Sequence, residues 1–223
     1  MDDMLIPAWD NGSFGGQNGG QGGGQDGGED GGHLRPFDKI EVHRRGLRHP
    51  AVSVFLRVGA AFLWQQRASG KYHSGGLWAN ACCSHASWGE APIHCAHRRM
   101  AEELGITGLS FRPLARVEYR AEVGPGMIEH EVVDVFLADL AAPPQITPDP
   151  DEVAATAWMT LAEIDAAIAA EPDRFTPWLK LYLTDHRTEL FGELFGADSG
   201  DADHFGGNAA SDKSLQSQGQ GRG

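Results

Sequence analysis

A glycine-rich tract near the N-terminus sets the first limit on how this chain folds. Residues 12–32 read GSFGGQNGGQGGGQDGGEDGG, and the segment after residue 196 is also short of side chains that a core can bury. Glycine loses more backbone entropy on ordering than any other residue, and without apolar burial nothing offsets that loss. We therefore expect a glycine-rich segment over residues 1–33, one domain over residues 34–195, and a flexible polar tail over residues 196–223.

The charge balance and the cysteines narrow the classes of protein and partner. A formal net charge of −13 argues against nucleic acid and anionic membranes, which need a basic footprint, but is compatible with a small anionic ligand. Three cysteines (Cys82, Cys83, Cys95) follow no disulfide framework, and neither a secretory signal nor a bilayer-spanning apolar run is visible. We expect a reduced, cytoplasmic protein and a monomer.

The hydrophobic pattern predicts strands packed between a few helices. The clearest helix runs from Glu90 to Gly105, with Pro92 in its first turn and Gly105 as a C-terminal stop. Residues 4–14 suggest a first strand, after which the glycine tract is either an insertion in a terminal hairpin or a plain tether. Residues 37–49 read as helical or irregular. Further strands are expected at 51–58, 60–68, 114–123, 130–140 and 156–160, with GPGMIE as the turn between the third and fourth of these, and further helices at 161–172 and 174–195. Without a regular βαβ repeat, this order predicts a mixed α/β sandwich with a mixed sheet.

Five side chains could together hold a divalent cation. Imidazole nitrogens with carboxylate oxygens suit Zn²⁺, Mn²⁺ or Mg²⁺. Glu129 and Glu131 are two residues apart, so on a strand both carboxylates point to one side, where they repel unless a cation or a proton lies between them. The alternative is that these are solvated polar residues near strand ends. The candidate ligands are His43, His49, His85, Glu129 and Glu131.

Four cationic side chains could bind a phosphorylated ligand if the fold brings them together in so acidic a chain. Taken singly, each is best explained as an exposed charge. Glu103 lies one helical turn beyond Arg99, so it either forms a surface salt bridge or holds a Mg²⁺ ion that bridges to phosphate oxygens. The four cations are Lys39, Arg67, Lys71 and Arg99.

The adjacent cysteines Cys82 and Cys83 have no zinc-site spacing. Successive residues of an extended segment face opposite ways, so one can pack as a small apolar side chain while the other is a reactive thiol. Cations close to that thiol would favour its thiolate form.

The helix resembles a degraded Nudix box, in which Arg99 replaces the glutamate that usually follows the conserved arginine. The matching positions are Ser84 for the opening glycine, then Glu90, Arg98, Met100, Glu102, Glu103, Gly105 and Ile106. Residues 37–187 as a whole resemble the type I isopentenyl-diphosphate isomerases, which have the Nudix fold. The segments that carry this resemblance are KIEVH, LRHPAVSVFL, QRASGKYHSGGLWANACCSH, RRMAEELG, EYRAEV, MIEHEV, PDEV and FTPW.

The resemblance implies interconversion of isopentenyl and dimethylallyl diphosphate, with Cys83 as the catalytic thiol and Glu131 and Tyr119 opposite it. It implies that the five candidate ligands hold one divalent metal, and that Glu103 and the Cys83 backbone carbonyl hold a Mg²⁺ that reaches the diphosphate. The four cations would bind the phosphates, and Trp178 would face the hydrocarbon. Ala79 replaces the threonine of the family's WTN motif. The alternatives are a Nudix-type hydrolase of another diphosphate and a non-catalytic metal-binding module.

Overall fold

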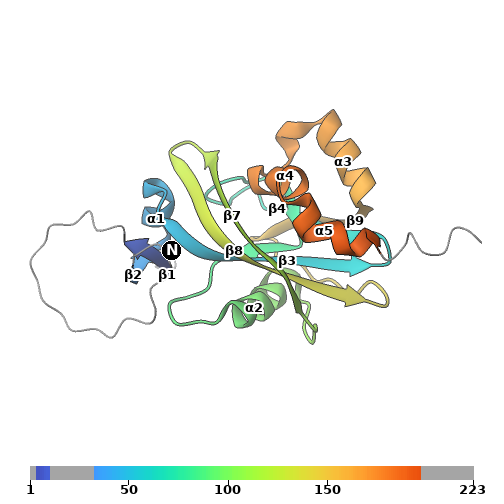
Figure 1. Cartoon of the computed structure of the whole chain (residues 1–223), viewed down its shortest axis with the longest axis horizontal. Coiled ribbons are helices and arrows are strands. Elements are labelled where there is room, and N and C mark those ends of the chain that lie inside the picture. The colour runs from blue at the N-terminus through green and yellow to red at the C-terminus, as the bar shows by residue number, and fades with distance from the viewer. Residues whose placement is uncertain (1–3, 11–32, 197–223) are drawn as a thin grey trace, which may run out of the picture.

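The computed structural model describes residues 4–10 and 33–196, which form one α/β unit (Figure 1). The glycine tract and the C-terminal tail, and with them the predictions of flexibility, lie outside the described residues. The elements in chain order are β1 (Leu5–Asp10), β2 (His33–Asp38), α1 (Lys39–Arg45), β3 (Arg48–Val58), β4 (Ala61–Arg67), β5 (Trp78–Asn80), β6 (Cys82–Ser84), α2 (Pro92–Leu104), β7 (Arg112–Gly124), β8 (Met127–Leu140), β9 (Val153–Thr160), α3 (Leu161–Ala170), the 3₁₀ turn η1 (Pro172–Arg174), α4 (Pro177–Thr184) and α5 (Arg187–Gly196).

The larger sheet is mixed, as the sequence predicts. Its order is β5-β4-β3-β8-β7, with β6 paired to β3 and β9 paired to β4. The pair β3–β8 is parallel, and the other pairs are antiparallel. The chain reaches β8 from β3 only after α2 and β7, because a parallel pair needs a long crossover connection.

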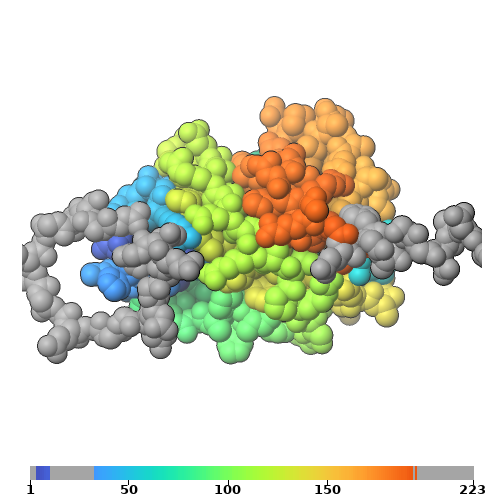
Figure 2. Space-filling model, viewed as in Figure 1, coloured from blue at the N-terminus to red at the C-terminus, as the bar shows by residue number. Residues whose placement is uncertain are grey.

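Helices cover both faces of this sheet, which gives the three layers of an α/β/α sandwich (Figure 1). Val54 and Leu56 of β3 pack on Met100 of α2, on one face. Phe55 points the other way and packs with Leu179 and Phe191 of the C-terminal helices. Both faces of β3 are therefore buried, which explains its nearly continuous apolar sequence. In the space-filling view, the C-terminal helices and α1 lie on opposite sides of the β7–β8 hairpin (Figure 2).

The first strand settles which role the glycine tract has in the chain. β1 pairs antiparallel with β2, residue by residue from Leu5 opposite Asp38 to Asp10 opposite His33. Residues 11–32 are therefore an insertion in a terminal hairpin and not a plain tether. A small core of Ile6, Ala8 and Val42 lies beneath this hairpin.

The predicted helix at 90–105 is confirmed as α2, with Pro92 in its first turn and Gly105 in the left-handed conformation at its end. The turn between β7 and β8 is shorter than GPGMIE, because strand pairing continues to Gly124 and resumes at Met127.

The single helix predicted at 174–195 is wrong, because α4 ends at Thr184 and α5 begins at Arg187. The Thr184 hydroxyl lies 3.0 Å from the Lys180 carbonyl oxygen and 2.8 Å from the Asp185 carboxylate, and donating its one proton to either competes with helix continuation. The break lets both helices pack on the same face of the sheet, as Leu179 of α4 and Phe191 of α5 share one core cluster.

All three cysteines lie in the described part of the chain as free thiols, in agreement with the absence of a disulfide framework. Within the described residues, no helix combines the length and apolar character that crossing a bilayer requires.

Replacing residues 11–32 by Asn-Gly should stabilise the protein. Asp10 and His33 are paired, so a two-residue turn fits their separation. Closing a 22-residue loop costs about 2 kcal/mol more conformational free energy than closing a two-residue one. We expect the urea midpoint to rise, and the free energy of unfolding to increase by up to about 2 kcal/mol.

The matched control keeps all 22 residues in a shuffled order and should leave the midpoint unchanged. An unchanged midpoint in the Asn-Gly variant would mean that the tract adds no closure cost.

Candidate active site

The strand register places a row of polar side chains across three strands. His49 lies beside Glu131 in the parallel β3–β8 pair, and Tyr119 lies beside the same glutamate in the antiparallel β7–β8 pair. Glu129, two residues earlier on β8, points to the same face. The Tyr119 hydroxyl lies 2.7 Å from Oε2 of Glu131 and 2.9 Å from Oε2 of Glu129. Two buried carboxylates thus share one hydroxyl group.

Three imidazoles converge on this row from separate elements. His43 comes from α1, His49 from the start of β3, and His85 from the residue after β6. The Nδ1 atoms of His43 and His49 each lie 2.7 Å from a backbone carbonyl oxygen, of Lys39 and Leu47 respectively. A carbonyl only accepts, so both Nδ1 atoms carry the proton and both Nε2 atoms keep a bare lone pair. This is the tautomer that a metal ligand needs.

The distances in this cluster suit a divalent cation. Nε2 of His85 lies 3.1 Å from Nε2 of His49 and 2.9 Å from Oε1 of Glu131. Two ligand atoms bound at about 2.1 Å and at a right angle lie about 3.0 Å apart. The ligand atoms of His43, His49, His85 and Glu131 all lie within 4.8 Å of one another. The group can therefore hold a divalent metal ion.

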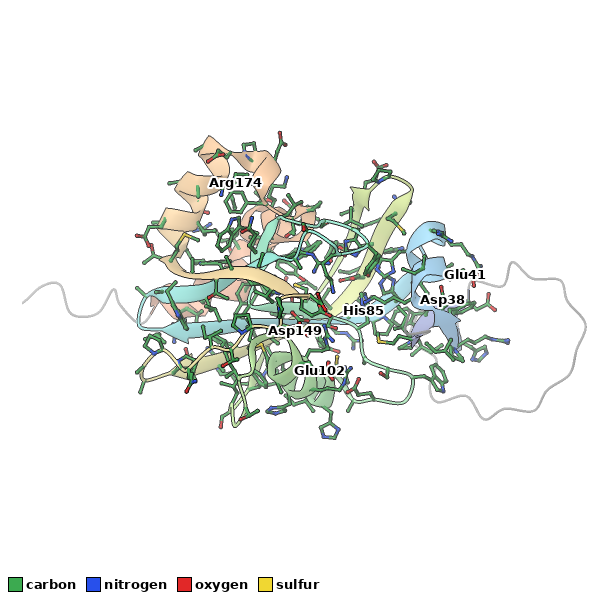
Figure 3. The ribbon with its side chains drawn as sticks, turned by 180° about the vertical axis from the view of Figure 1, so that it is seen from behind. Asp38, Glu41, His85, Glu102, Asp149 and Arg174 are labelled. Carbon is green, nitrogen blue, oxygen red and sulfur yellow. The ribbon has the colours of Figure 1, made fainter. Side chains whose placement is uncertain are left out.

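Burial keeps two of the three imidazoles neutral. It lowers the pKa of His43 to about 4 and holds the pKa of His85 well below its usual value. His85 lies deep inside the molecule, whereas Asp38 and Glu41 lie towards its outer end (Figure 3). At neutral pH these two side chains are therefore uncharged, which is the form that can bind a metal ion.

The two carboxylates differ in their tendency to ionise. Burial and the charge of Glu131 raise the pKa of Glu129 well above its usual value. Burial also opposes ionisation of Glu131, but the contact with His49 and the hydrogen bond from Nε2 of His85 outweigh it and hold the pKa of this glutamate well below its usual value. Glu131 therefore carries the negative charge of the pair and Glu129 the proton.

Cys83 lies on β6, where it pairs with Ser53 of β3. Its thiol donates to Oδ1 of Asn80 at 2.9 Å and lies 3.2 Å from the Ser53 hydroxyl. Burial raises the pKa of Cys83 to about 12. The expectation that nearby cations favour the thiolate is wrong for this molecule, because desolvation outweighs the attraction of Arg67.

Cys82 points to the opposite side of β6, as an extended segment requires. It is fully buried in the core beneath α2, where its thiol lies 3.5 Å from Glu103. The adjacent cysteines therefore have different surroundings, one in the core and one in a pocket.

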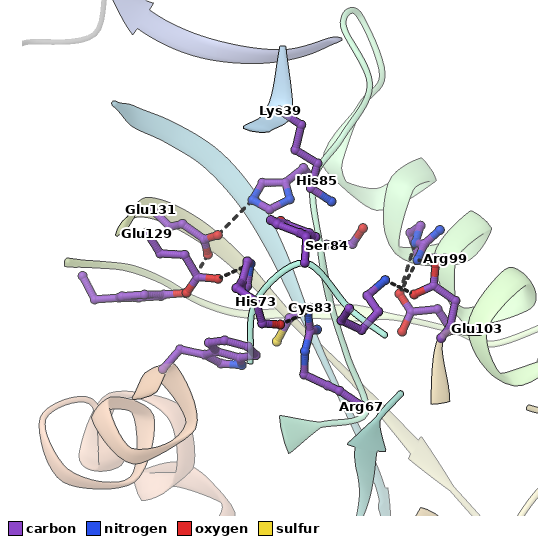
Figure 4. A pocket seen from close by; sticks show the side chains of 15 residues that line it. Lys39, Arg67, His73, Cys83, Ser84, His85, Arg99, Glu103, Glu129 and Glu131 are labelled. Atoms are coloured by element: carbon purple, nitrogen blue, oxygen red, sulfur yellow. Dashed lines mark hydrogen bonds and ion pairs between the residues drawn. The ribbon is translucent and has the colours of Figure 1, made fainter. Parts of the chain in front are cut away.

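The pocket encloses about 420 Å³ of empty space, part of it open to solvent, and it brings the four predicted cations together (Figure 4). The buried Nε of Arg67 has no hydrogen-bond partner among the described residues. Burial and the charges of Lys71, Arg99 and Arg67 lower the pKa of Lys39 to about 8. Cations held this close repel one another, so the pocket favours an anion.

Glu103 faces the cations from α2. Its Oε1 accepts from Arg99 at 2.7 Å, which is the predicted salt bridge, and its Oε2 accepts from Gln65 at 3.1 Å. Oε1 also accepts from Nε of Arg99 at 3.1 Å, whereas Oε2 keeps a second lone pair, where a cation can still bind. Along the same helix, Arg98 pairs with Glu90 at 2.7 Å, which joins two further positions of the degraded Nudix box.

Nearly all predicted site residues meet in one place. His43 and His49 are fully buried just behind the pocket wall. The others line the pocket: Lys39, Arg67, Lys71, Cys83, His85, Arg99, Glu103, Tyr119, Glu129, Glu131 and Trp178. The solvated alternative is therefore wrong for the five candidate ligands, each of which is at most 5 % exposed.

Tyr72, His73 and Glu152 are among the lining residues that sequence reasoning missed. Glu152 pairs with Lys71 and with Arg99. His73 forms a second possible metal group with His43 and Glu129. The segments KYHSGG and PDEV contain all three, but only their place beside the cations and the carboxylates in the fold marks them.

Comparisons with known proteins agree with this arrangement. Residues 47–179 match the NUDIX domain. The crystal structure of DR0079 from Deinococcus radiodurans is similar in fold, with a TM-score of 0.51 and 18% sequence identity over 64% of this chain and 82% of that one.

Sequence relatives are much closer than this structural neighbour. The isopentenyl-diphosphate Delta-isomerase of Cereibacter sphaeroides strain ATCC 17025 is 53% identical over 190 residues, which cover 85% of this chain and 96% of the relative. The protein of the same name from Rhodobacter capsulatus is 52% identical over 191 residues, which cover 86% of this chain and 97% of the relative.

The lowered pKa of Lys39 predicts how anion binding depends on pH. Below pH 8 Lys39 is charged and attracts an anion; above pH 8 the ligand-free side chain is neutral, so binding must take up a proton. We expect the affinity for pyrophosphate with Mg²⁺ to fall about tenfold per pH unit above pH 8, relative to a Lys39→Arg variant. Calorimetric titration from pH 6.5 to 9.5 gives the pyrophosphate affinity of both proteins. In the ratio of the two affinities, the protonation of pyrophosphate itself cancels. A ratio that stays constant over this range would assign the proton to another group.

Proposed function

The chain belongs to the isopentenyl-diphosphate Delta-isomerase family of NUDIX-domain proteins, and on that premise we propose which residues carry the reaction. As an enzyme of this family it interconverts isopentenyl diphosphate and dimethylallyl diphosphate. The observation that carries the assignment is about 50% identity over nearly the whole length of such isomerases. The roles below rest on the geometry of the pocket.

The reaction moves a double bond by one position. The terminal carbon of the alkene gains a proton, and the CH₂ group on the other side of the branched carbon loses one, so the atoms balance without any added reactant. The five-carbon part of the substrate is flat, so an acid can act on one of its faces and a base on the other. In our proposal these are the thiol of Cys83, on β6, and the carboxylate of Glu131, on β8.

The protonation of this pair fits the task. Burial keeps the proton on Cys83, whose pKa is raised to about 12, and His49 and His85 help keep Glu131 ionised. The ligand-free pair therefore contains one acid and one base. Tyr119 touches Glu131 at 2.7 Å, where its hydroxyl can pass a proton between carboxylate and substrate. Because the reaction is reversible, each member of the pair serves as donor in one direction.

A divalent ion at His43, His49, His85, Glu129 and Glu131 would withdraw charge from the carboxylates and hold them in place. Zn²⁺, Mn²⁺ and Mg²⁺ all suit a set of imidazoles and carboxylates. We also propose that Glu103 and the Cys83 carbonyl hold a Mg²⁺ that accompanies the diphosphate.

The four cations provide the binding energy. Lys39, Lys71 and Arg99 line the pocket together with Glu103, and the buried Nε of Arg67, which has no hydrogen-bond partner among the described residues, can donate to an anion that enters. Fixing the diphosphate here positions the small apolar end, which has few contacts of its own to offer.

Trp178 supplies an apolar wall for that end. It is 1% exposed, and its ring lies 5.3 Å from the Arg67 guanidinium. A carbocation intermediate would be trapped by water, so the pocket must exclude it. The face of an indole also stabilises a positive charge, by about 2 kcal/mol in a desolvated site.

A hydrolase mechanism has less support in this pocket. At the position of the carboxylate that follows the conserved arginine of the Nudix box, the chain has Arg99, which is itself paired with Glu103. A metal-binding module without catalysis would not need Cys83 and four cations beside the metal ligands. The monomeric state, the cytoplasmic location and the domain bounds of 34–195 stay predictions.

Cys83→Ala and Glu131→Gln should each lower the rate of isomerisation by about a thousandfold, since each removes a group that transfers a proton. Diphosphate binding should survive, because neither residue belongs to the cation cluster. Incubation with isopentenyl diphosphate and Mg²⁺, followed by measurement of the acid-labile allylic product, gives the rates; release of phosphate is followed in parallel.

Cys82→Ala is the matched control and should retain activity within a fewfold, because Cys82 lies in the core under α2. Full activity in Cys83→Ala would refute the role of the thiol. Release of phosphate by the wild-type protein without allylic product would instead favour hydrolysis.

A further inference from the structure

His73 is a buried histidine that the proposed mechanism does not use. It lies in the loop between β4 and β5 and is only 6% exposed. Its Nε2 is 3.4 Å from Oε1 of Glu129. Its ring stacks against that of His43 with a centroid distance of 5.4 Å. Figure 4 shows it next to Glu129 in the pocket, with a dashed line between the two side chains.

The loop holds this side chain in a fixed orientation. Ser74 has a φ of 50°, a conformation that a residue with a side chain adopts only when its surroundings enforce it. The Ser74 hydroxyl donates to the Val123 carbonyl at 3.1 Å, which ties the loop to the end of β7. The backbone conformation that places His73 is therefore maintained by a contact with another strand.

The same contact determines the tautomer of His73. Nδ1 of His73 lies 3.3 Å from the Ser74 oxygen, and the single proton of that hydroxyl already goes to Val123. Nδ1 must therefore donate, which leaves a bare lone pair on Nε2. This lone pair faces a carboxylate oxygen of Glu129. Two acceptors that face each other inside a protein need a proton or a cation between them.

The single ligand atom of His43 determines whether the two possible metal groups can bind one ion or two. Its Nδ1 donates to the Lys39 carbonyl, so Nε2 is its only ligand atom. That atom belongs both to the group with His49, His85 and Glu131 and to the group with His73 and Glu129. One nitrogen lone pair binds one cation. Without His43, the second group would keep only two ligands, too few for a site of its own.

From these contacts we propose that His73 is a sixth protein ligand of the divalent metal at the His/Glu centre. This inference rests on the metal centre of the proposed function and deepens it. The full set is then four imidazole nitrogens and two carboxylate oxygens, from His43, His49, His73, His85, Glu129 and Glu131. Six protein ligands would leave no place in the coordination of the ion that substrate has to fill. Four imidazoles also favour Zn²⁺ over Mg²⁺, which prefers oxygen and retains water.

Metal affinity tests the proposal without an activity assay. The full-length chain, stripped of metal by a chelator, is titrated with Zn²⁺ against a chromophoric competitor. His73→Ala should weaken Zn²⁺ binding by at least about tenfold. His94→Ala, which removes an exposed histidine of α2, is the matched control and should bind like the wild type.

A conservative variant separates a ligand from a positioning residue. His73→Gln keeps an N–H group that can hydrogen-bond Glu129 but has no imidazole. If His73 is a ligand, the glutamine variant binds Zn²⁺ as weakly as the alanine variant. If His73 only positions Glu129, the glutamine variant regains wild-type affinity, and the proposal is overturned.

The Co²⁺-loaded wild-type protein gives a direct count of ligands and does not depend on whether the variants fold. Each imidazole bound to Co²⁺ contributes one exchangeable ring N–H signal to the paramagnetically shifted proton spectrum. We expect four such signals in the wild type; three would exclude His73.

His49→Ala distinguishes failure of this inference from failure of the centre itself. If His49→Ala loses Zn²⁺ affinity while His73→Ala does not, only the sixth ligand is wrong. If both bind like the wild type, Zn²⁺ is held elsewhere and the proposed centre is wrong as well.

Discussion

The parallel pairing of β3 with β8 is the constraint on which the site depends. It sets His49 beside Glu131, and the antiparallel partner β7 then brings Tyr119 to the same glutamate. A shift of either register by one residue would turn these side chains to the opposite face of the sheet. The apolar residues that alternate along β3 lock the register, because both faces of that strand are buried against helices. The packing of the core and the geometry of the site are thus one arrangement.

Burial gives these side chains their chemistry. The same desolvation that lowers the pKa of His43 also raises the pKa of Cys83 and of Glu129. In water, the imidazoles would titrate near neutral pH and the two carboxylates would be charged. Inside the protein, the imidazole of His43 is neutral and able to bind a metal ion, the thiol keeps its proton, and only one carboxylate stays ionised. An acid, a base and a metal-binding group therefore arise from ordinary side chains without any unusual residue.

The cations and the histidines of the pocket have separate tasks in the proposed function. Lys71 and Arg99 lie beside Glu152, whereas Arg67 lies against Trp178, and together with Lys39 these cations are proposed to bind the diphosphate. The histidines lie towards β7 and β8, where they surround the carboxylates. The thiol of Cys83 lines the same pocket, on the short strand β6. This separation lets charge hold one end of the substrate while protons move at the other.

The sequence by itself determined the fold class, the extent of α2 and the opposite orientation of the two adjacent cysteines, because apolar periodicity and turn residues act locally. It also contained the motifs of the family, from which nearly all of the pocket residues could be named. Only the tertiary structure decided that Cys83 keeps its proton, that the last helix divides in two, and that Tyr72, His73 and Glu152 belong to the pocket. Those outcomes depend on desolvation and on contacts between segments far apart in the chain. A local pattern contains no information about either until the strands are paired.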